Sequence, residues 1–327
     1  MTEGDFDRAL KLADEALAAE PKSAQWLELK AEALAGLERF EEAADLYAEL
    51  ADASPKDARL QLMAADLLVR TQDPELARDA LDRLDRAEKR VKSQRELHVE
   101  LLRVRAEAHD VLEEPHAVLR SLEQAWKLLP DAPGLRLDRA LALFETARFD
   151  EARRELTGLA SMEPNDAWPH HFLGLIAERK GDAATAEREL AVAQRLDPES
   201  FPKPVKLSDA EWSRAVAHAI DALPAHAREQ MGNATVTFAP LPSDDDLQGG
   251  DLSPTMLGIF RGTAIPDRNV LEAMHHLTAE IVLFQRNLER AVRSKDELFE
   301  QIDITVLHEV GHLLGLDEED LWERGLD

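Results

Sequence analysis

The sequence has 327 residues, enough for two domains, and is 44% hydrophobic and 32% charged, which is typical of a folded globular protein. Its formal net charge of −27 leaves no basic surface to neutralise phosphates, so a nucleic-acid ligand is not expected. Cysteine is absent, which excludes disulfides, thiolate metal ligands and a cysteine nucleophile.

The chain shows neither a secretion signal nor a membrane-spanning segment. Its start has no basic patch and no apolar core of signal-peptide length. No apolar run reaches the ~18 residues that a membrane span requires. These features predict a cytoplasmic protein without a membrane partner.

A repeat runs through roughly the first 200 residues. It is marked by five prolines that are 34, 75, 34 and 34 residues apart: Pro21, Pro55, Pro130, Pro164 and Pro198. In register with them, one position of each first helix is small: Ala31, Ala65, Ala106, Ala140 and Gly174. One position of each second helix is small too: Ala9, Ala43, Ala77, Ala152 and Ala186. Small side chains let paired helices approach closely, and a proline cannot continue a helix, so the pattern predicts an α-solenoid.

This pattern resembles the tetratricopeptide repeat (TPR), most clearly in residues 24–56, 133–164 and 166–198. The resemblance implies about five repeats plus a half in residues 1–200, with a concave surface that binds a protein partner or an extended peptide. Residues 2–20 supply only the second helix of a repeat, so a preceding segment is expected. No proline occurs near position 89, and residues 88–96 form a charged insertion that we expect to extend a helix or lengthen a connection.

Histidines within the repeats are interpreted as structural. His98, His109 and His116 stand alone and are expected on the surface or in a groove. His170 and His171 stand at a repeat start, where a large side chain packs.

The composition changes after two prolines at residues 201–204, which predicts a linker and a second domain over residues 205–327. Ser208 is expected to cap a helix that reaches about Ala222. The further predicted elements are a short helix at 225–231, a strand at 234–239, a polar loop at 243–251, a strand ending at 261–262, a strand at 280–285 and a last helix from 294. This order predicts a small α+β domain, in a chain that is mainly α overall.

The last helix carries His308-Glu-Val-Gly-His312. Residues four apart share a helix face, so both imidazoles can bind one metal ion, while Glu309 beside them can accept a proton from a water molecule at the metal. Ser294 and Glu297 form a capping-box pattern at the helix start. Apolar residues recur at helical spacing along it: Phe299, Ile302, Val306, Val310 and Leu313.

Gly315 is expected to end this helix, because glycine adopts the left-handed conformation at little cost. Four carboxylates follow the glycine and can turn back towards the metal as a third ligand: Asp317, Glu318, Glu319 and Asp320.

Residues 205–327 resemble the small bacterial zincin-like metallopeptidases, whose pattern is H-E-x-x-H-x-x-G-x-x-D. Three blocks carry the resemblance: residues 257–263, 281–286 and 308–321. It implies that His308 and His312 bind Zn²⁺ and that Glu309 is the catalytic base. The aspartate of the family corresponds to Glu318, which is therefore the expected third ligand. The alternatives are Asp317, Asp320 or a distant histidine, either His275 or His276.

Two functions are consistent with these features. The first is a zinc-dependent peptidase that cuts a protein or peptide recruited by the TPR array, with the third strand edging the cleft and pairing with the substrate. The second is a TPR scaffold or regulatory protein whose zincin domain binds metal but cleaves little. An array that covers the cleft is a further hypothesis. Arg261 and Arg286 are interpreted as surface charges or as candidates for the oxyanion.

Overall fold

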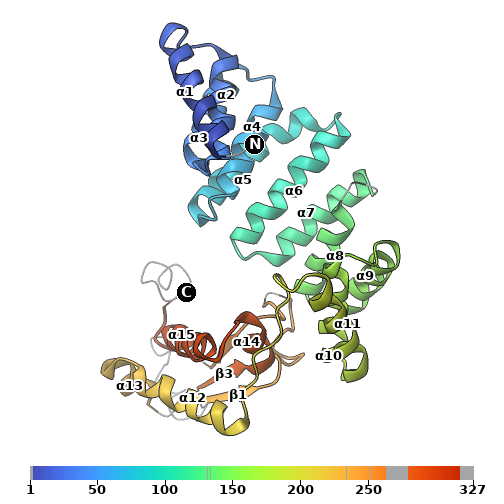
Figure 1. The fold of residues 1–327 in the computed structure, drawn as a ribbon, viewed down its shortest axis with the longest axis vertical. Helices are drawn as coiled ribbons and strands as arrows, with labels where there is room; N and C mark the ends of the chain where they lie inside the picture. The colour runs from blue at the N-terminus through green and yellow to red at the C-terminus, as the bar shows by residue number, and fades with distance from the viewer. Residues whose placement is uncertain are drawn as a thin grey trace, which may run out of the picture. The chain divides into compact units, whose positions relative to one another are not determined.

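The computed structural model describes residues 3–130, 132, 134–232, 234–250, 252–262 and 279–316. The chain forms two compact units, Met1–Glu155 and Leu156–Asp327. It is mainly α-helical with one small sheet near its C-terminal end (Figure 1). The predicted fold class, an α-solenoid followed by a small α+β region, is confirmed.

The first unit is a succession of helices in which each packs against the next (Figure 1). Their bounds are α1 (Glu3–Ala19), α2 (Ala24–Gly36), α3 (Phe40–Ala53), α4 (Ala58–Val69), α5 (Pro74–Val91), α6 (Arg95–Val111), α7 (Pro115–Leu128) and α8 (Leu135–Glu145). Helix α9 (Phe149–Met162) runs from the first unit into the second. Over the described residues, the helices α2 to α11 follow the pairing that the repeat predicts.

The small positions of the repeat lie where the helices touch. Ala31, Ala65 and Ala140 are fully buried on first helices, and Ala43 and Ala77 are fully buried on second helices. At the equivalent Gly174, an added methyl group would lie 2.6 Å from Leu190 Cγ. Since these positions leave no room for a larger side chain, their recurrence in the sequence follows from the close packing of each helix pair.

The charged insertion at residues 88–96 lengthens two helices. Helix α5 has 18 residues and ends at Val91, and α6 has 17 residues and begins at Arg95. Asp73 starts α5 by accepting hydrogen bonds from the backbone N–H groups of Glu75 and Leu76. The insertion is therefore a helix extension, one of the two expected forms.

The second unit contains the last helix pair and the sheet. Its helices are α10 (Ala167–Arg179), α11 (Ala183–Leu196), α12 (Asp209–Ala222), α13 (Ala225–Met231), α14 (Gln285–Ala291) and α15 (Lys295–Leu313). Its strands are β1 (Thr235–Ala239), β2 (Gly258–Arg261) and β3 (Glu280–Phe284). The last helix pair and the sheet thus share one compact unit. The division into domains at residues 200–205 stays a prediction from the sequence.

The sheet has the order β1-β3-β2 within the described residues. Strand β1 pairs with β3 in parallel, and β2 pairs with β3 antiparallel. Residues Ile281 to Phe284 of β3 are at most 2% exposed, as expected of an enclosed strand. The expectation that the third strand edges the cleft is therefore wrong: among the described residues β3 is the central strand, and β2 and β1 are the edges.

Helices α12 and α15 pack on each other and share a core with the sheet. Trp212 and Val216 of α12 meet the apolar side of α15 there. This core fixes α15, the helix with the two histidines, against β2 and β3.

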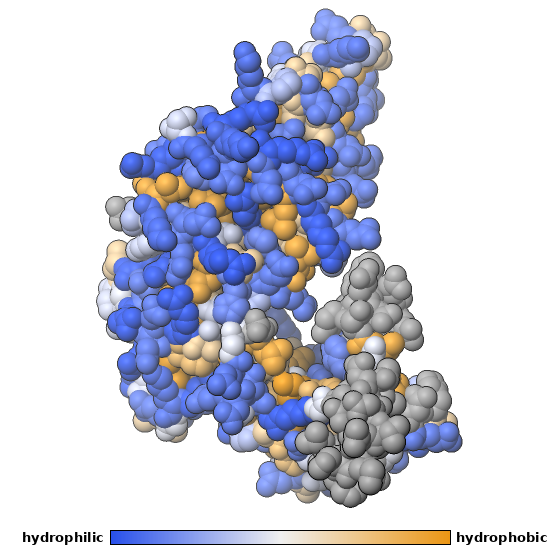
Figure 2. All heavy atoms as spheres, turned by 180° about the vertical axis from the view of Figure 1, so that it is seen from behind, coloured by the Kyte–Doolittle hydropathy of each residue, from blue (hydrophilic) through white to orange (hydrophobic). Residues whose placement is uncertain are grey.

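The described surface is largely hydrophilic, as Figure 2 shows for one face. Large apolar side chains are exposed only singly among the described residues: Leu12, Met162, Trp168, Leu252 and Ile304. In the part of the chain that the structure describes, no helix combines the length and apolarity needed to cross a membrane.

Candidate metal centre

Helix α15 begins and ends as its sequence predicts. The Ser294 hydroxyl accepts a hydrogen bond from the Glu297 N–H, and the Glu297 carboxylate accepts one from the N–H of Arg293. At the other end, Gly315 has a φ of 86° and donates its N–H to the His312 carbonyl, while Leu316 donates to the Gly311 carbonyl. These two bonds form a Schellman turn, which satisfies the last carbonyls of the helix.

The two histidine rings of α15 converge. The Nε2 atoms of His308 and His312 are 3.1 Å apart, and the ring planes are inclined by 84°. Two nitrogens that bind one tetrahedral zinc at about 2.0–2.1 Å are about 3.3 Å apart. The separation of the two nitrogens is therefore close to that of two ligands of one metal ion, and it also suits a shared proton.

The Schellman turn orients the ring of His312. The Leu316 carbonyl lies 3.2 Å from His312 Nδ1, so the ring donates from Nδ1 and presents the lone pair of Nε2. A backbone carbonyl is a usual partner of the non-ligating nitrogen of a metal-bound histidine. The end of the helix and the orientation of the His312 ring thus depend on the same turn.

Glu309 lies between α15 and β2 and is 6% exposed. A methyl group placed on Gly258, the first residue of β2, would lie 3.1 Å from Glu309 Oε1 and 2.8 Å from Thr305 Cγ2. The strand can approach the carboxylate so closely because Gly258 has no side chain. The structure therefore brings the rings of His308 and His312 together and buries Glu309 of the same helix against β2.

The structure does not describe the residue that the sequence predicts as the third metal ligand. Glu318 and its alternatives, Asp317, Asp320, His275 and His276, lie outside the described residues. Over the described ranges, no group of three or more histidine, cysteine, aspartate or glutamate side chains could hold a metal ion. The assignment of Glu318 stays a prediction.

Arg261 and Arg286, the two arginines considered for the oxyanion, are paired with carboxylates. Arg261 contacts Asp246 at 2.7 Å and Glu280 at 3.2 Å. Arg286 lies 3.5 Å from Glu289. Each guanidinium therefore has a carboxylate partner within its own unit.

Sequence reasoning missed the contact of Gly258 with Glu309. The available signal was a glycine inside a predicted strand, which often marks a close backbone approach. The hydrogen bond from His312 Nδ1 to the Leu316 carbonyl could not be predicted from the type of residue 316, because any residue supplies a carbonyl.

Comparison with known proteins assigns families to three parts of the chain. Residues 231–326 match the model of the zincin-like metallopeptidases. Residues 1–58 and 113–176 match models of the tetratricopeptide repeat. No curated protein matches the sequence.

Several solved structures are similar to part of the chain. The chain is 19% identical to YrrB, a TPR protein with an unusual peptide-binding site, with a TM-score of 0.45 over 58% of this chain and 95% of YrrB. It is 18% identical to pilF of Pseudomonas aeruginosa, with a TM-score of 0.49 over 66% of this chain and 90% of that chain. It is 16% identical to the MamA protein, with a TM-score of 0.43 over 57% of this chain and 97% of that chain.

Proposed function

We propose that this chain, which combines tetratricopeptide repeats with a zincin-like metallopeptidase domain, is a zinc-dependent peptidase that acts on proteins or peptides recruited by its repeats. The observation that carries the proposal is the convergence of His308 Nε2 and His312 Nε2 on α15, the helix that also carries the buried Glu309. In a chain without cysteine, a catalytic zinc site needs imidazole and carboxylate ligands, and a further carboxylate can act as the base.

The zinc ligands in this proposal are His308 and His312 through Nε2, with Glu318 as the third. Glu318 stands at the position of the family aspartate, and Asp317 and Asp320 are the alternatives. When bound, zinc supplies Lewis acidity, which polarises a peptide carbonyl and lets water lose a proton near neutral pH. The His312 ring is held ready for this role by the Leu316 carbonyl.

Glu309 is the proposed general base. Its carboxylate accepts the proton of the attacking water and passes it to the leaving amine, a role that contributes about 10²- to 10⁴-fold to the rate. The contact with β2 keeps the carboxylate on the side of α15 that faces the strand.

The substrate is proposed to bind along β2. This strand is an edge of the sheet within the described residues, and it starts against Glu309. An extended peptide can add to such an edge through backbone hydrogen bonds. Strand addition thus moves from β3, where the sequence placed it, to β2, because both sides of β3 are already paired.

The repeats are proposed to recruit the protein to be cut. Solenoids of paired helices present a concave surface suited to an extended peptide or a protein partner. In this reading the array determines which proteins reach the zincin domain, and the domain determines which bond is cut.

The test is cleavage of casein and of a peptide library by the wild-type protein and by Glu309→Gln, with zinc measured in both. The substitution keeps the shape of the side chain and removes its basicity. We expect cleavage to fall by about 10²- to 10⁴-fold with zinc content unchanged.

His308→Ala serves as the matched variant, because it should lose zinc as well as cleavage. If the zinc-loaded wild-type protein cuts neither casein nor any library peptide, the peptidase proposal is wrong. Capture of a partner by the repeats without cleavage then favours a binding protein.

A further inference from the structure

Strand β2 is too short for its position to be fixed by strand pairing alone. It has four residues and pairs only with β3 within the described residues. One further backbone bond, from the Phe284 N–H to the Leu257 carbonyl at 2.8 Å, extends this pairing. An edge strand of this length relies on contacts outside the sheet.

Asn287 anchors the segment that leads into β2. This residue of α14 is 7% exposed, and its side-chain amide donates to the carbonyls of Pro254 at 3.1 Å and Met256 at 2.7 Å. Both donors of one amide group are thus used within four residues of Gly258. Leaving the buried carbonyl of Pro254 and the partly buried carbonyl of Met256 without these donors would be costly, so the amide fixes the path of the chain into the strand.

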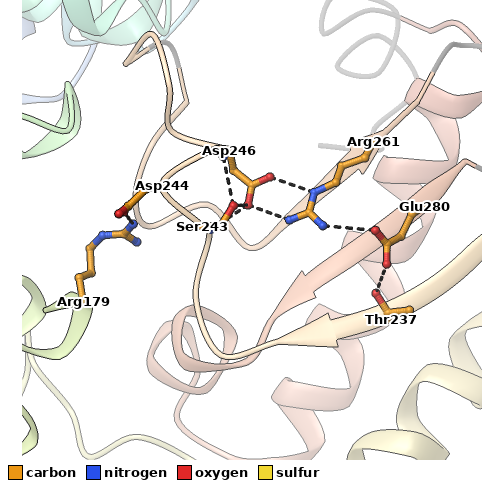
Figure 3. Close-up of polar contacts among 7 residues, drawn as sticks. All are labelled: Arg179, Thr237, Ser243, Asp244, Asp246, Arg261 and Glu280. Carbon is orange, nitrogen blue, oxygen red and sulfur yellow. Dashed lines mark hydrogen bonds and ion pairs between the residues drawn. The ribbon is translucent and has the colours of Figure 1, made fainter. Parts of the chain in front are cut away.

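Arg261 anchors the other end of β2, as Figure 3 shows. Its guanidinium donates to both carboxylate oxygens of Asp246, from Nε at 2.9 Å and from Nη2 at 2.7 Å. Its Nη1 donates to Glu280 at 3.2 Å, and Glu280 accepts a bond from the Thr237 hydroxyl at 2.9 Å. The last residue of β2 is thereby tied to the β1–β2 connection and to the other two strands.

The partner of Arg261 is itself held firmly. The Asp246 side chain is 7% exposed and also accepts bonds from the Ser243 N–H and hydroxyl, each at 2.7 Å. Burial pushes the pKa of Asp246 upwards, but the hydrogen bonds from Arg261 and Ser243 outweigh it and hold the pKa below its usual value. A two-point bond between ions fixes direction as well as distance.

We infer that Asn287 and Arg261 are positioning residues of the proposed peptidase, which hold β2 in register so that Gly258 faces Glu309 and a bound peptide is aligned with the two histidines. The inference rests on the proposed function, because it assigns β2 as the substrate edge. Neither residue touches the reacting atoms. Their effect is on alignment, where a shift of about 1 Å can cost as much as 10²-fold.

The experiment compares Asn287→Asp and Arg261→Gln in the full chain, using a peptide of about eight residues taken from the library cleavage, a length that can pair along a whole strand. We expect KM to rise about tenfold in each variant, with kcat within about twofold and zinc content unchanged. Arg261→Lys should recover part of the loss, because it keeps the charge without the two-point bond. Arg214→Gln, at an exposed arginine of α12, is the control and should change nothing.

Hydrogen exchange of the β2 amides provides a readout that does not depend on cleavage. Both variants should lose protection at residues 258–261 while α15 keeps its own. Unchanged protection of β2, or kcat and zinc content falling together with KM unaltered, would overturn the inference. Failure of the peptidase proposal is recognised separately, by the absence of cleavage in the wild-type protein, and the exchange result then decides on positioning alone.

Discussion

The repeat helices and the helix with the two histidines differ in how often each stabilising contact occurs. In the repeats, one contact recurs: Ala31, Ala65 and Ala140 are each buried at the same position of a first helix, where it touches its neighbour. Around α15 each contact occurs once, as between Gly258 and Glu309 or between His312 and Leu316. A repeated contact can be weakened in one place and survive in the others. A contact that occurs once leaves the site no substitute.

The largest effect on stability should come from truncating the chain between the last helix pair and the sheet. Arg290 pairs with Glu178 of α10 at 2.5 Å, Arg179 pairs with Asp244 at 3.2 Å, and the Glu289 carbonyl accepts a bond from the Val205 N–H. A fragment of residues 205–327 loses both ion-pair partners on α10. We expect it to be destabilised by about 3 kcal/mol relative to residues 156–327, because the largely buried Arg290 loses its carboxylate partner, whereas Asp244 is 98% exposed and loses little.

Urea unfolding followed by circular dichroism measures this difference. Equal midpoints for the two fragments would show that the last helix pair is an independent neighbour of the sheet, and would place the boundary at residues 200–205 as the sequence predicts.

The next effect compares a glycine of the site with a glycine of the repeats. Gly258→Ala forces a methyl group against Thr305 and Glu309, and should lower kcat/KM about 10²-fold while zinc is retained. The methyl group of Gly36→Ala meets the ring of Phe6, which can turn aside. It should change the free energy of unfolding by less than about 1 kcal/mol, since helix propensity offsets the crowding.

Peptide cleavage and thermal unfolding of both variants test the contrast. Similar losses of cleavage in the two proteins would mean that closeness to Glu309 is irrelevant.

A smaller effect is expected from pH at His171, which stacks on Phe201 with ring centres 4.3 Å apart. Burial, with a further contribution from Arg290, lowers the pKa of His171 to about 4. Between about pH 6.5 and 4 the unfolded chain binds a proton that the folded chain does not, so stability falls as the pH falls through this window. At pH 5 the loss is about 2 kcal/mol relative to pH 8.

His171→Phe keeps an aromatic ring against Phe201 and cannot be protonated. Urea midpoints at pH 5 and pH 8 should therefore lie closer together in this variant than in the wild-type protein. An unchanged pH dependence would assign the acid sensitivity to other groups.

The smallest effect is expected inside the repeats. Asp73→Ala removes the side chain that caps α5 and should cost about 1 kcal/mol of unfolding free energy, with zinc content and cleavage unaltered. Differential scanning calorimetry measures the cost. A change in cleavage would show that the repeats act on the chemistry and not only on recruitment.

The sequence predicted those features that repeat or that follow from local rules. The recurring prolines and small residues predicted the helix pairs, and Ser208, Ser294 and Gly315 marked helix ends where the structure has them. The i, i+4 spacing of His308 and His312 predicted their convergence, since helix geometry alone brings such residues together.

What the sequence could not predict depends on pairs of residues distant along the chain. Strand order is one case, since the alternation that predicts β3 does not say which strands flank it. Asn287 is another, because a buried amide is recognised only from the carbonyls that it meets. The contact between Gly258 and Glu309 spans 51 positions and belongs to the same class.

The spacing between His312 and Gly315 has a structural consequence. Three residues after the second histidine, the chain reverses at the one residue type that tolerates a φ of 86° without strain, and the reversal delivers a carbonyl oxygen to the back of the imidazole. A metal-binding ring placed one turn from a helix end can therefore acquire its outer support from the way the helix stops, with no dedicated side chain. Any designed helix that ends at the same interval past a histidine should inherit this support.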